Sequence, residues 1–224
     1  ILMFIIQDVS RFMEKENLLR NQNLRMAAVS DELLLSKQVL KSKLEKIESL
    51  NKELEHIAYF DKLTEIPNRA KMMVDLEQII KDSSEKNTKA AIMVIDVDNL
   101  KKVNDSMGHT AGDELLQRTA SVLKNLCNED ISVYRFGGDE FLLAVTNVYS
   151  RDYMGTVGDT VLEELNKVNI NISAGIALYP NDTTKLDELF QYADMAMYEV
   201  KKSGKNAVYF FEQLMQEKFV ERIC

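Results

Sequence analysis

The protein has few cysteines, and the apolar run at the start of the sequence is short. The first feature argues against a zinc site or a cysteine nucleophile, and the second against a membrane-spanning helix in that run. The 224 residues include only two cysteines, Cys127 and Cys224. They lie far apart, and neither has the neighbouring His and acidic residues of a zinc ligand or a nucleophile. Such usage is typical of a reducing compartment, so we expect two structural thiols in a cytoplasmic protein or in the cytoplasmic part of a larger, membrane-anchored protein. The run ILMFII at the start holds six apolar residues, against the roughly 20 that a membrane-spanning helix requires.

Positive charge is also in deficit. The chain has 28 Lys and Arg against 36 Asp and Glu, a net charge of -8. A negative protein repels phosphate polymers at long range, which argues against a nucleic acid polymer as a partner. With 46% hydrophobic and 29% charged residues, the composition is that of an ordinary globular protein.

Glycine and proline are absent from residues 12–57. Apolar residues recur there at an interval of seven: Phe12, Leu19, Met26, Leu33, Leu40, Ile47 and Leu54. The positions three residues further on are mostly polar until Leu50, so the apolar seam is strong on one side only. At ~1.5 Å per residue the helix would be about 65 Å long, too long to bury its stripe against one small domain. We therefore predict a coiled-coil helix over residues 11–58 that forms a parallel homodimer, the alternative being a single amphipathic helix packed on another domain.

Both ends of the chain have patterns of their own. Two alternatives are open for the first residues: the end of an upstream membrane helix, or the last strand of a sensor domain. The segment IIQDVSRFMEKENLL resembles the strand and exit helix of a PAS domain, so we expect residues 1–10 to end an upstream sensor domain. Residues 212–224 have the charged pattern of a helical tail or linker.

A mixed domain is predicted over residues 59–211, beginning where Pro67 and Asn68 interrupt the helical pattern. Strands are predicted over 90–96, 132–136, 139–145, 170–178 and 207–211, and helices over 68–82, 99–104, 112–127, 152–167 and 185–202. Interleaved strands and helices predict an α/β (α+β) layer fold, with a tight hairpin at Gly137 and Gly138.

Acidic residues stand at two places where this fold could bind a ligand. The apolar strand AAIMVI is followed by Asp96 and Asp98, and the end of such a strand can hold a hard cation such as Mg2+. The plainer alternative is that these acids only solubilise the strand end, with Asp98 capping the next helix. If the hairpin lies beside this strand, Asp139 faces the same volume, and two acids there require a cation or a proton between them. Carboxylates with lysines nearby suit phosphoryl transfer.

The hairpin residues Arg135-Phe136-Gly137-Gly138-Asp139-Glu140-Phe141 resemble the signature of the GGDEF family of diguanylate cyclases. Five further stretches resemble motifs of that family in the same order: DKLTEIPNR (61–69), DVDNLKKVND (96–105), GHTAGDELL (108–116), SAGIALYP (173–180) and ADMAMYEVKKSGKN (193–206). The resemblance implies a fold like the palm of nucleotidyl cyclases and polymerases, with a central, mostly antiparallel sheet flanked by helices. It also implies that two such domains, each holding one GTP, join them into cyclic di-GMP and two pyrophosphates.

The resemblance assigns roles to residues at matching positions. It implies metal binding by Asp96, Asp139, Glu140 and the Val97 carbonyl, with Mg2+ or alternatively Mn2+ as the ion. Asp139 and Glu140 would be catalytic, Glu140 by helping to deprotonate the ribose 3′-hydroxyl. The remaining substrate contacts would be Asn104 and Asp113 on guanine, Lys101, Lys201 and Lys205 on phosphates, and the open backbone at Gly137 and Gly138.

Five positions depart from the family pattern. Glu65 stands where glycine is usual, which puts the backbone of that loop in question. Leu100 replaces a common Phe, and Lys205 takes a place often held by Arg, which loses a bidentate contact. The inhibitory R-x-x-D motif would fall at Asn128 and Ile131, so we expect no product inhibition at that site.

Three functions are consistent with these observations. We expect an active cyclase controlled through the coiled-coil helix by an upstream sensor. The alternative is a catalytically inactive, GTP-binding regulatory module of a larger signalling protein. A dimerising scaffold with an inert α/β domain is the third.

Overall fold

The computed structural model describes residues 2–216, with side chains from Arg11 onward except at Ala27. The chain divides after Glu55 into two compact units, a helical stalk and an α/β domain. Cys224 and most of the predicted C-terminal tail lie outside the described residues; within them, residues 213–216 are helical.

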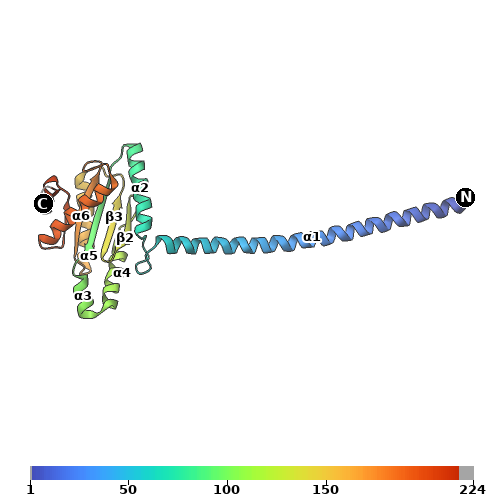
Figure 1. Ribbon diagram of the computed structural model, residues 1–224, viewed down its shortest axis with the longest axis horizontal. Helices are drawn as coiled ribbons and strands as arrows, with labels where there is room; N and C mark the ends of the chain where they lie inside the picture. The colour runs from blue at the N-terminus through green and yellow to red at the C-terminus, as the bar shows by residue number, and fades with distance from the viewer. Residues whose placement is uncertain (1, 217–224) are drawn as a thin grey trace. The chain divides into compact units, whose positions relative to one another are not determined.

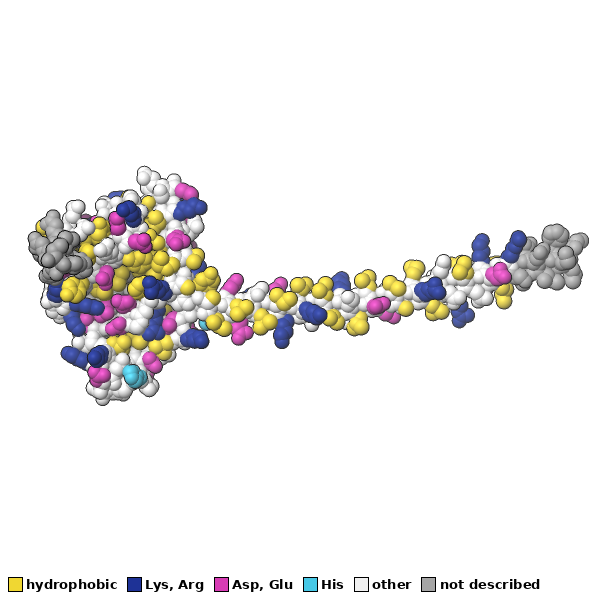
Figure 2. Space-filling model, viewed as in Figure 1, with side chains coloured by type: hydrophobic (Ala, Val, Ile, Leu, Met, Phe, Trp, Pro, Cys, Tyr) yellow, Lys and Arg dark blue, Asp and Glu magenta, His cyan; other side chains and the backbone are white. Residues whose placement is uncertain are grey.

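The stalk is one continuous helix, α1 (Leu2–Tyr59). Its length confirms the predicted helix, whereas the strand expected in the PAS-like opening segment is wrong because residues 2–10 are helical. The seven heptad residues are all exposed, from 52% at Ile47 to 72% at Met26. Hydrophobic side chains recur along the stalk with charged ones between them (Figure 2). No helix between residues 2 and 216 has an apolar stretch long enough to cross a bilayer.

The domain is a five-stranded sheet flanked by helices (Figure 1). Its elements are α2 (Arg69–Lys86), β1 (Ala90–Val97), α3 (Leu100–Met107), α4 (His109–Asn125), β2 (Ile131–Gly137), β3 (Glu140–Val145), α5 (Arg151–Lys167), β4 (Ile172–Tyr179), α6 (Leu186–Lys202) and β5 (Ala207–Phe210). The strand order is β2-β3-β1-β4-β5, and only the β4–β5 pair is parallel. This confirms the predicted mostly antiparallel sheet.

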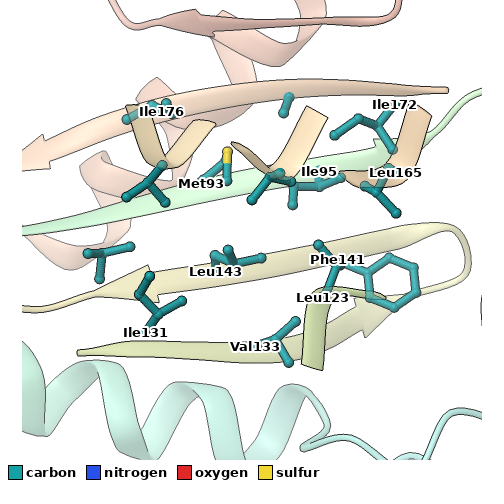
Figure 3. Close-up of a cluster of buried hydrophobic side chains, with 14 of the residues drawn as sticks. Met93, Ile95, Leu123, Ile131, Val133, Phe141, Leu143, Leu165, Ile172 and Ile176 are labelled. Carbon is teal, nitrogen blue, oxygen red and sulfur yellow. The ribbon is translucent and has the colours of Figure 1, made fainter. Parts of the chain in front are cut away.

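Each face of the sheet carries its own core, because alternate residues of a strand point to opposite faces. Met93 and Ile95 of β1 pack in the cluster that includes Leu123 of α4 and Leu165 of α5, and Figure 3 shows these side chains together. Residues of the opposite parity, such as Ile92, pack against α2 and α6. Asp96 has this second parity and therefore lies on the face covered by α6.

Gly175 of β4 allows α6 to approach the sheet closely. A Cβ at this position would collide with the Ala193 carbonyl oxygen and the Met197 amide nitrogen of α6. Glycine is therefore required by space, and the close approach brings the C-terminal end of α6, with Lys201, to the end of β1.

Candidate active site

The end of β1 lies directly beside the glycine hairpin. In the antiparallel pairing of β1 with β3, Asp96 is opposite Glu140, and the Val97 amide donates to the Asp139 carbonyl at 3.1 Å. Asp139 lies in the turn before β3, which begins at Glu140. The acids of two distant motifs thus meet at one edge of the sheet.

Negative charge is crowded at this edge. Burial raises the pKa of Asp96, the nearby charges of Asp139 and Asp98 add to the rise, and a bond and charge from Lys201 oppose it. Burial likewise raises the pKa of Glu140, and the charges of Asp96, Asp194 and Asp139 raise it further. Burial and the repulsion between these carboxylates both oppose their ionisation, and such a site favours a bound cation.

Lys201 provides one cation. Its Nζ lies 2.7 Å from Asp96 Oδ2, with 11% of the Asp96 side chain and 32% of the Lys201 side chain exposed. The resemblance placed this lysine on phosphate, whereas the structure pairs it with a predicted metal ligand. The two roles are compatible only if the ammonium turns from Asp96 to the phosphates when a ligand arrives.

Asp194 of α6 belongs to the same cluster, although the sequence analysis gave it no role. Burial raises its pKa, with Lys201 opposing the rise, and its charge acts on Glu140. Asp194 and Lys201 are seven residues apart, about two helical turns, and so share one face of α6. Asp194 stands in the stretch 193–206 that resembles a family motif, and its spacing from Lys201 is the sequence signal that would have included it.

Asp98 does not cap a helix. Asn99 is the residue before α3 and makes no capping bond with its side chain. The carboxylate of Asp98 instead accepts hydrogen bonds from Ser173 Oγ at 2.9 Å and from the Asn206 amide at 3.1 Å. The capping alternative is therefore wrong.

The hairpin turn is held by Arg135, which lies near the end of β2 just before the turn. Its guanidinium donates to the Gly138 carbonyl through Nη2 at 2.7 Å and to Asp61 Oδ1 through Nη1 at 2.7 Å. Burial alone would raise the pKa of Asp61, but hydrogen bonds from Thr64 and Arg135 outweigh it and lower the pKa. A Cβ at Gly137 or Gly138 would meet no described atom within 4 Å, so the turn has open space beside its backbone.

The predicted guanine contacts lie on the helical hairpin of α3 and α4. Asn104 of α3 packs on Gly112, where a Cβ would collide with Asn104 Oδ1. This oxygen is buried and has no hydrogen-bond partner among the described residues. Asp113 follows Gly112 directly and is exposed, so the two predicted guanine contacts stand on adjoining surfaces.

Two further lysines surround the strand end. Lys101 lies exposed in the first turn of α3. Lys205 Nζ is 3.3 Å from Asn99 Oδ1 and 3.7 Å from Asp98 Oδ1. Both lysines are placed where a polyanion could reach them.

The donor set suits a hard divalent cation. Carboxylate oxygens of Asp96, Asp139 and Glu140 and the carbonyl of Val97 are of the ligand type that Mg2+ prefers. Within residues 2–216, no three His, Cys, Asp or Glu side chains are close enough together to form a metal site by themselves. Asp96 and Asp139 with the Val97 carbonyl, completed by water and phosphate, remain a donor set that fits Mg2+. The crowded negative charge described above supports it.

Comparison with known proteins identifies the family. The family model of the diguanylate cyclase GGDEF domain matches residues 58–207. The chain therefore belongs to the GGDEF family.

Relatives and solved structures agree with this assignment. The chain is 34% identical over 181 residues to the bifunctional diguanylate cyclase/cyclic di-GMP phosphodiesterase MucR of Pseudomonas aeruginosa, covering 77% of this chain and 26% of MucR. It is 32% identical over 171 residues to the diguanylate cyclase TpbB of the same species, covering 72% of this chain and 39% of TpbB. The chain thus spans only a quarter to two fifths of these relatives.

The GGDEF domain of TpbB superposes with a TM-score of 0.67 at 30% identity, covering 72% of this chain and 99% of that one. The coiled coil and GGDEF domain of DgcB from Caulobacter crescentus has a TM-score of 0.69 at 24% identity, covering 76% and 94%. The second likeness concerns the fold alone.

Proposed function

We propose that this protein is a diguanylate cyclase that condenses two GTP molecules into cyclic di-GMP and two pyrophosphates across a homodimer. The observation that carries the proposal is the pairing of Asp96 with Glu140 beside the turn that holds Asp139. The GGDEF signature and the strand-end motif, far apart in sequence, converge there on one polar edge of the sheet.

The acids divide into two roles. Asp96, Asp139 and the Val97 carbonyl, with Glu140 as a further ligand, would hold Mg2+ or Mn2+, which when bound would neutralise charge on the triphosphate. Glu140 is suited to accept the proton of the ribose 3′-hydroxyl, because its raised pKa makes it a stronger base than an exposed carboxylate. The 3′-oxygen of each GTP attacks the α-phosphorus of the other, and each attack releases pyrophosphate.

The remaining residues bind and orient GTP. Asp113 can accept hydrogen bonds from the N1–H and exocyclic amine of guanine, which adenine cannot offer in that arrangement, and Asn104 would contact the same base. Lys101, Lys201 and Lys205 would contact phosphates. The open backbone at Gly137 and Gly138 would leave room for the nucleotide.

One domain holds half of the reaction, so the stalk has a function in assembly. A coiled coil through residues 11–58 would raise the effective concentration of one active site at the other. Its exposed heptad residues support this pairing. An upstream sensor could then regulate turnover by changing the register or splay of the two helices.

Product inhibition through the R-x-x-D site is not expected. Asn128 and Ile131 occupy those two positions. Asn128 Oδ1 accepts from the amides of Asp130 and Ile131 at 2.8 and 3.1 Å, so this side chain stabilises its own turn. Neither residue offers the charged contacts of the motif.

The test is incubation of the dimeric protein, stalk included, with GTP and Mg2+. We expect cyclic di-GMP and pyrophosphate in a 1:2 ratio, and no product from Asp139→Ala, which keeps the fold because Asp139 lies in an open turn. GTP binding without product would favour the regulatory module. A protein that neither binds GTP nor turns it over would favour the inert scaffold.

A further inference from the structure

The carboxylate of Asp98 is enclosed and fully engaged within the protein. Only 1% of its side chain is exposed. Oδ1 accepts from the hydroxyl of Ser173 on β4, and Oδ2 accepts from the backbone amide of Asn206. These partners are 75 and 108 residues away in sequence, so Asp98 ties the end of β1 to two distant segments.

The segment bound by Asp98 has an unusual backbone. Gly204, Lys205 and Asn206 have φ angles of 117°, 68° and 49°, three successive residues in the region that favours glycine. Each non-glycine residue in that region costs roughly 1–2 kcal/mol and persists only where other contacts hold it. The described contacts that do so are the Asn206 amide on Asp98 and the Lys205 amide on the Val200 carbonyl at 3.0 Å.

The same segment carries a cation that faces solvent. The Lys205 ammonium lies 3.7 Å from Asp98 Oδ1 and 3.3 Å from Asn99 Oδ1, and its side chain is 41% exposed. Its position thus depends on a buried carboxylate on one side and on the residue before α3 on the other. A lysine side chain on a free loop would lose rotamer and backbone entropy on binding a phosphate, and prior ordering reduces that loss.

We propose that Asp98 is a positioning residue: it holds residues 204–206 in their left-handed conformation and thereby presents the Lys205 ammonium to the triphosphate of GTP. The inference rests on the proposed function only in naming the ligand. The two acids at the end of β1 then have different roles: Asp96 faces the ligand, and Asp98 contacts other parts of the protein.

The first experiment needs no ligand. Amide hydrogen exchange at Asn206 should be at least about tenfold faster in Asp98→Ala than in the wild type. A hydrogen bond to a charged acceptor typically shifts the opening equilibrium of the amide by about tenfold or more. Asp98→Asn should exchange almost as slowly as the wild type, because its oxygen can still accept from Asn206 while its amide donates to Ser173 Oγ. Unchanged exchange in Asp98→Ala would overturn the proposal.

A matched control is available at the open end of the β2–β3 hairpin, away from the glycine turn. Asp130 accepts from Thr146 Oγ1 and Asn147 Nδ2, beside Asn147, which has a φ of 52°. Asp130→Ala should therefore loosen its own turn and leave Asn206 exchange unchanged. Faster exchange at Asn206 in both variants would mean a general loosening and would overturn the specific role.

The second experiment separates phosphate from base. In Asp98→Ala, GTP with Mg2+ should bind about tenfold more weakly, whereas guanosine, which has no phosphate, should bind as in the wild type.

In a Lys205→Met background the further change Asp98→Ala should weaken GTP binding less than about twofold, because Asp98 acts through Lys205. Equal losses for GTP and guanosine, or independent effects of the two changes, would overturn the proposal. A wild type that binds no GTP would overturn the proposed function instead, while the exchange experiment still decides the role of Asp98.

Discussion

The stalk and the domain differ in the exposure of their apolar side chains. Leu33 and Leu54 of α1 are 68% and 62% exposed, whereas Met93 and Leu143 of the sheet are completely buried. A long helix in water gains little stability from its own backbone bonds and depends on packing of an apolar face. The domain therefore buries its own apolar residues, whereas those of the stalk are exposed, as the proposed pairing with a second helix requires.

Matched truncations test this contrast most strongly. Leu143→Ala should lower the free energy of unfolding of the domain by about 3 kcal/mol, because it leaves a cavity in a packed core. Leu33→Ala should leave the domain transition unchanged and weaken only self-association. Urea unfolding of the domain, followed at several protein concentrations, measures the first effect, and sedimentation measures the second. A shift of the domain transition by Leu33→Ala would show that the two units are not energetically separate.

A charge in the heptad seam should disrupt pairing and turnover together. Leu40→Lys places a charge in the predicted interface, so we expect a monomer at micromolar concentration and at least about tenfold less cyclic di-GMP per chain. Leu24→Lys is the matched control, since Leu24 is equally exposed at 63% but lies off the heptad of Leu40. Equal loss of dimer in both variants would contradict the assigned seam, and full turnover by a Leu40→Lys monomer would contradict the need for two domains.

Sequence patterns predicted this fold well because its elements have strong periodicity. The buried strand before Asp96 and the glycine turn before Asp139 could be located from apolar runs and turn residues alone. Their convergence followed from the family motifs, and the register of Asp96 with Glu140 agrees with it.

What the sequence did not predict depends on long-range packing. Asp98 has the local character of a helix cap, yet Ser173 and the Asn206 amide compete successfully for its carboxylate. Lys201 has the character of a solvated helix charge, yet the close approach of α6 at Gly175 brings it to Asp96. In both cases the deciding partner comes from another element, which no local pattern specifies.

The opening loop of the domain offers a stabilising change. Glu65 has a φ of 55°, so the loop keeps a left-handed residue where the family usually has glycine. Glu65→Gly should raise the free energy of unfolding by up to about 1 kcal/mol, because relief of strain exceeds the entropy that glycine adds to the unfolded chain. Glu65→Ala, which keeps a Cβ, separates backbone strain from loss of charge. Equal stabilisation by both variants would show that charge, not backbone conformation, is responsible.

The smallest effect concerns the crowded acids and depends on pH. Burial and the charges of Asp96, Asp194 and Asp139 raise the pKa of Glu140 above its usual value of 4.5, so ionising it opposes folding. The folded state then binds more protons than the unfolded state between pH 4.5 and the raised pKa, and stability falls as pH rises through that interval.

Glu140→Gln removes the cost of ionising this side chain and should stabilise the domain at pH 7 by up to about 0.5 kcal/mol, a value kept small because solvent screens the site. The gain should vanish below pH 4.5, where the carboxyl is protonated in both states. Thermal unfolding across this pH range, with the exposed Glu85→Gln of α2 as the control, measures it. A gain that is independent of pH would mean that repulsion among these carboxylates does not limit stability, and the electrostatic argument for a bound cation would lose its support.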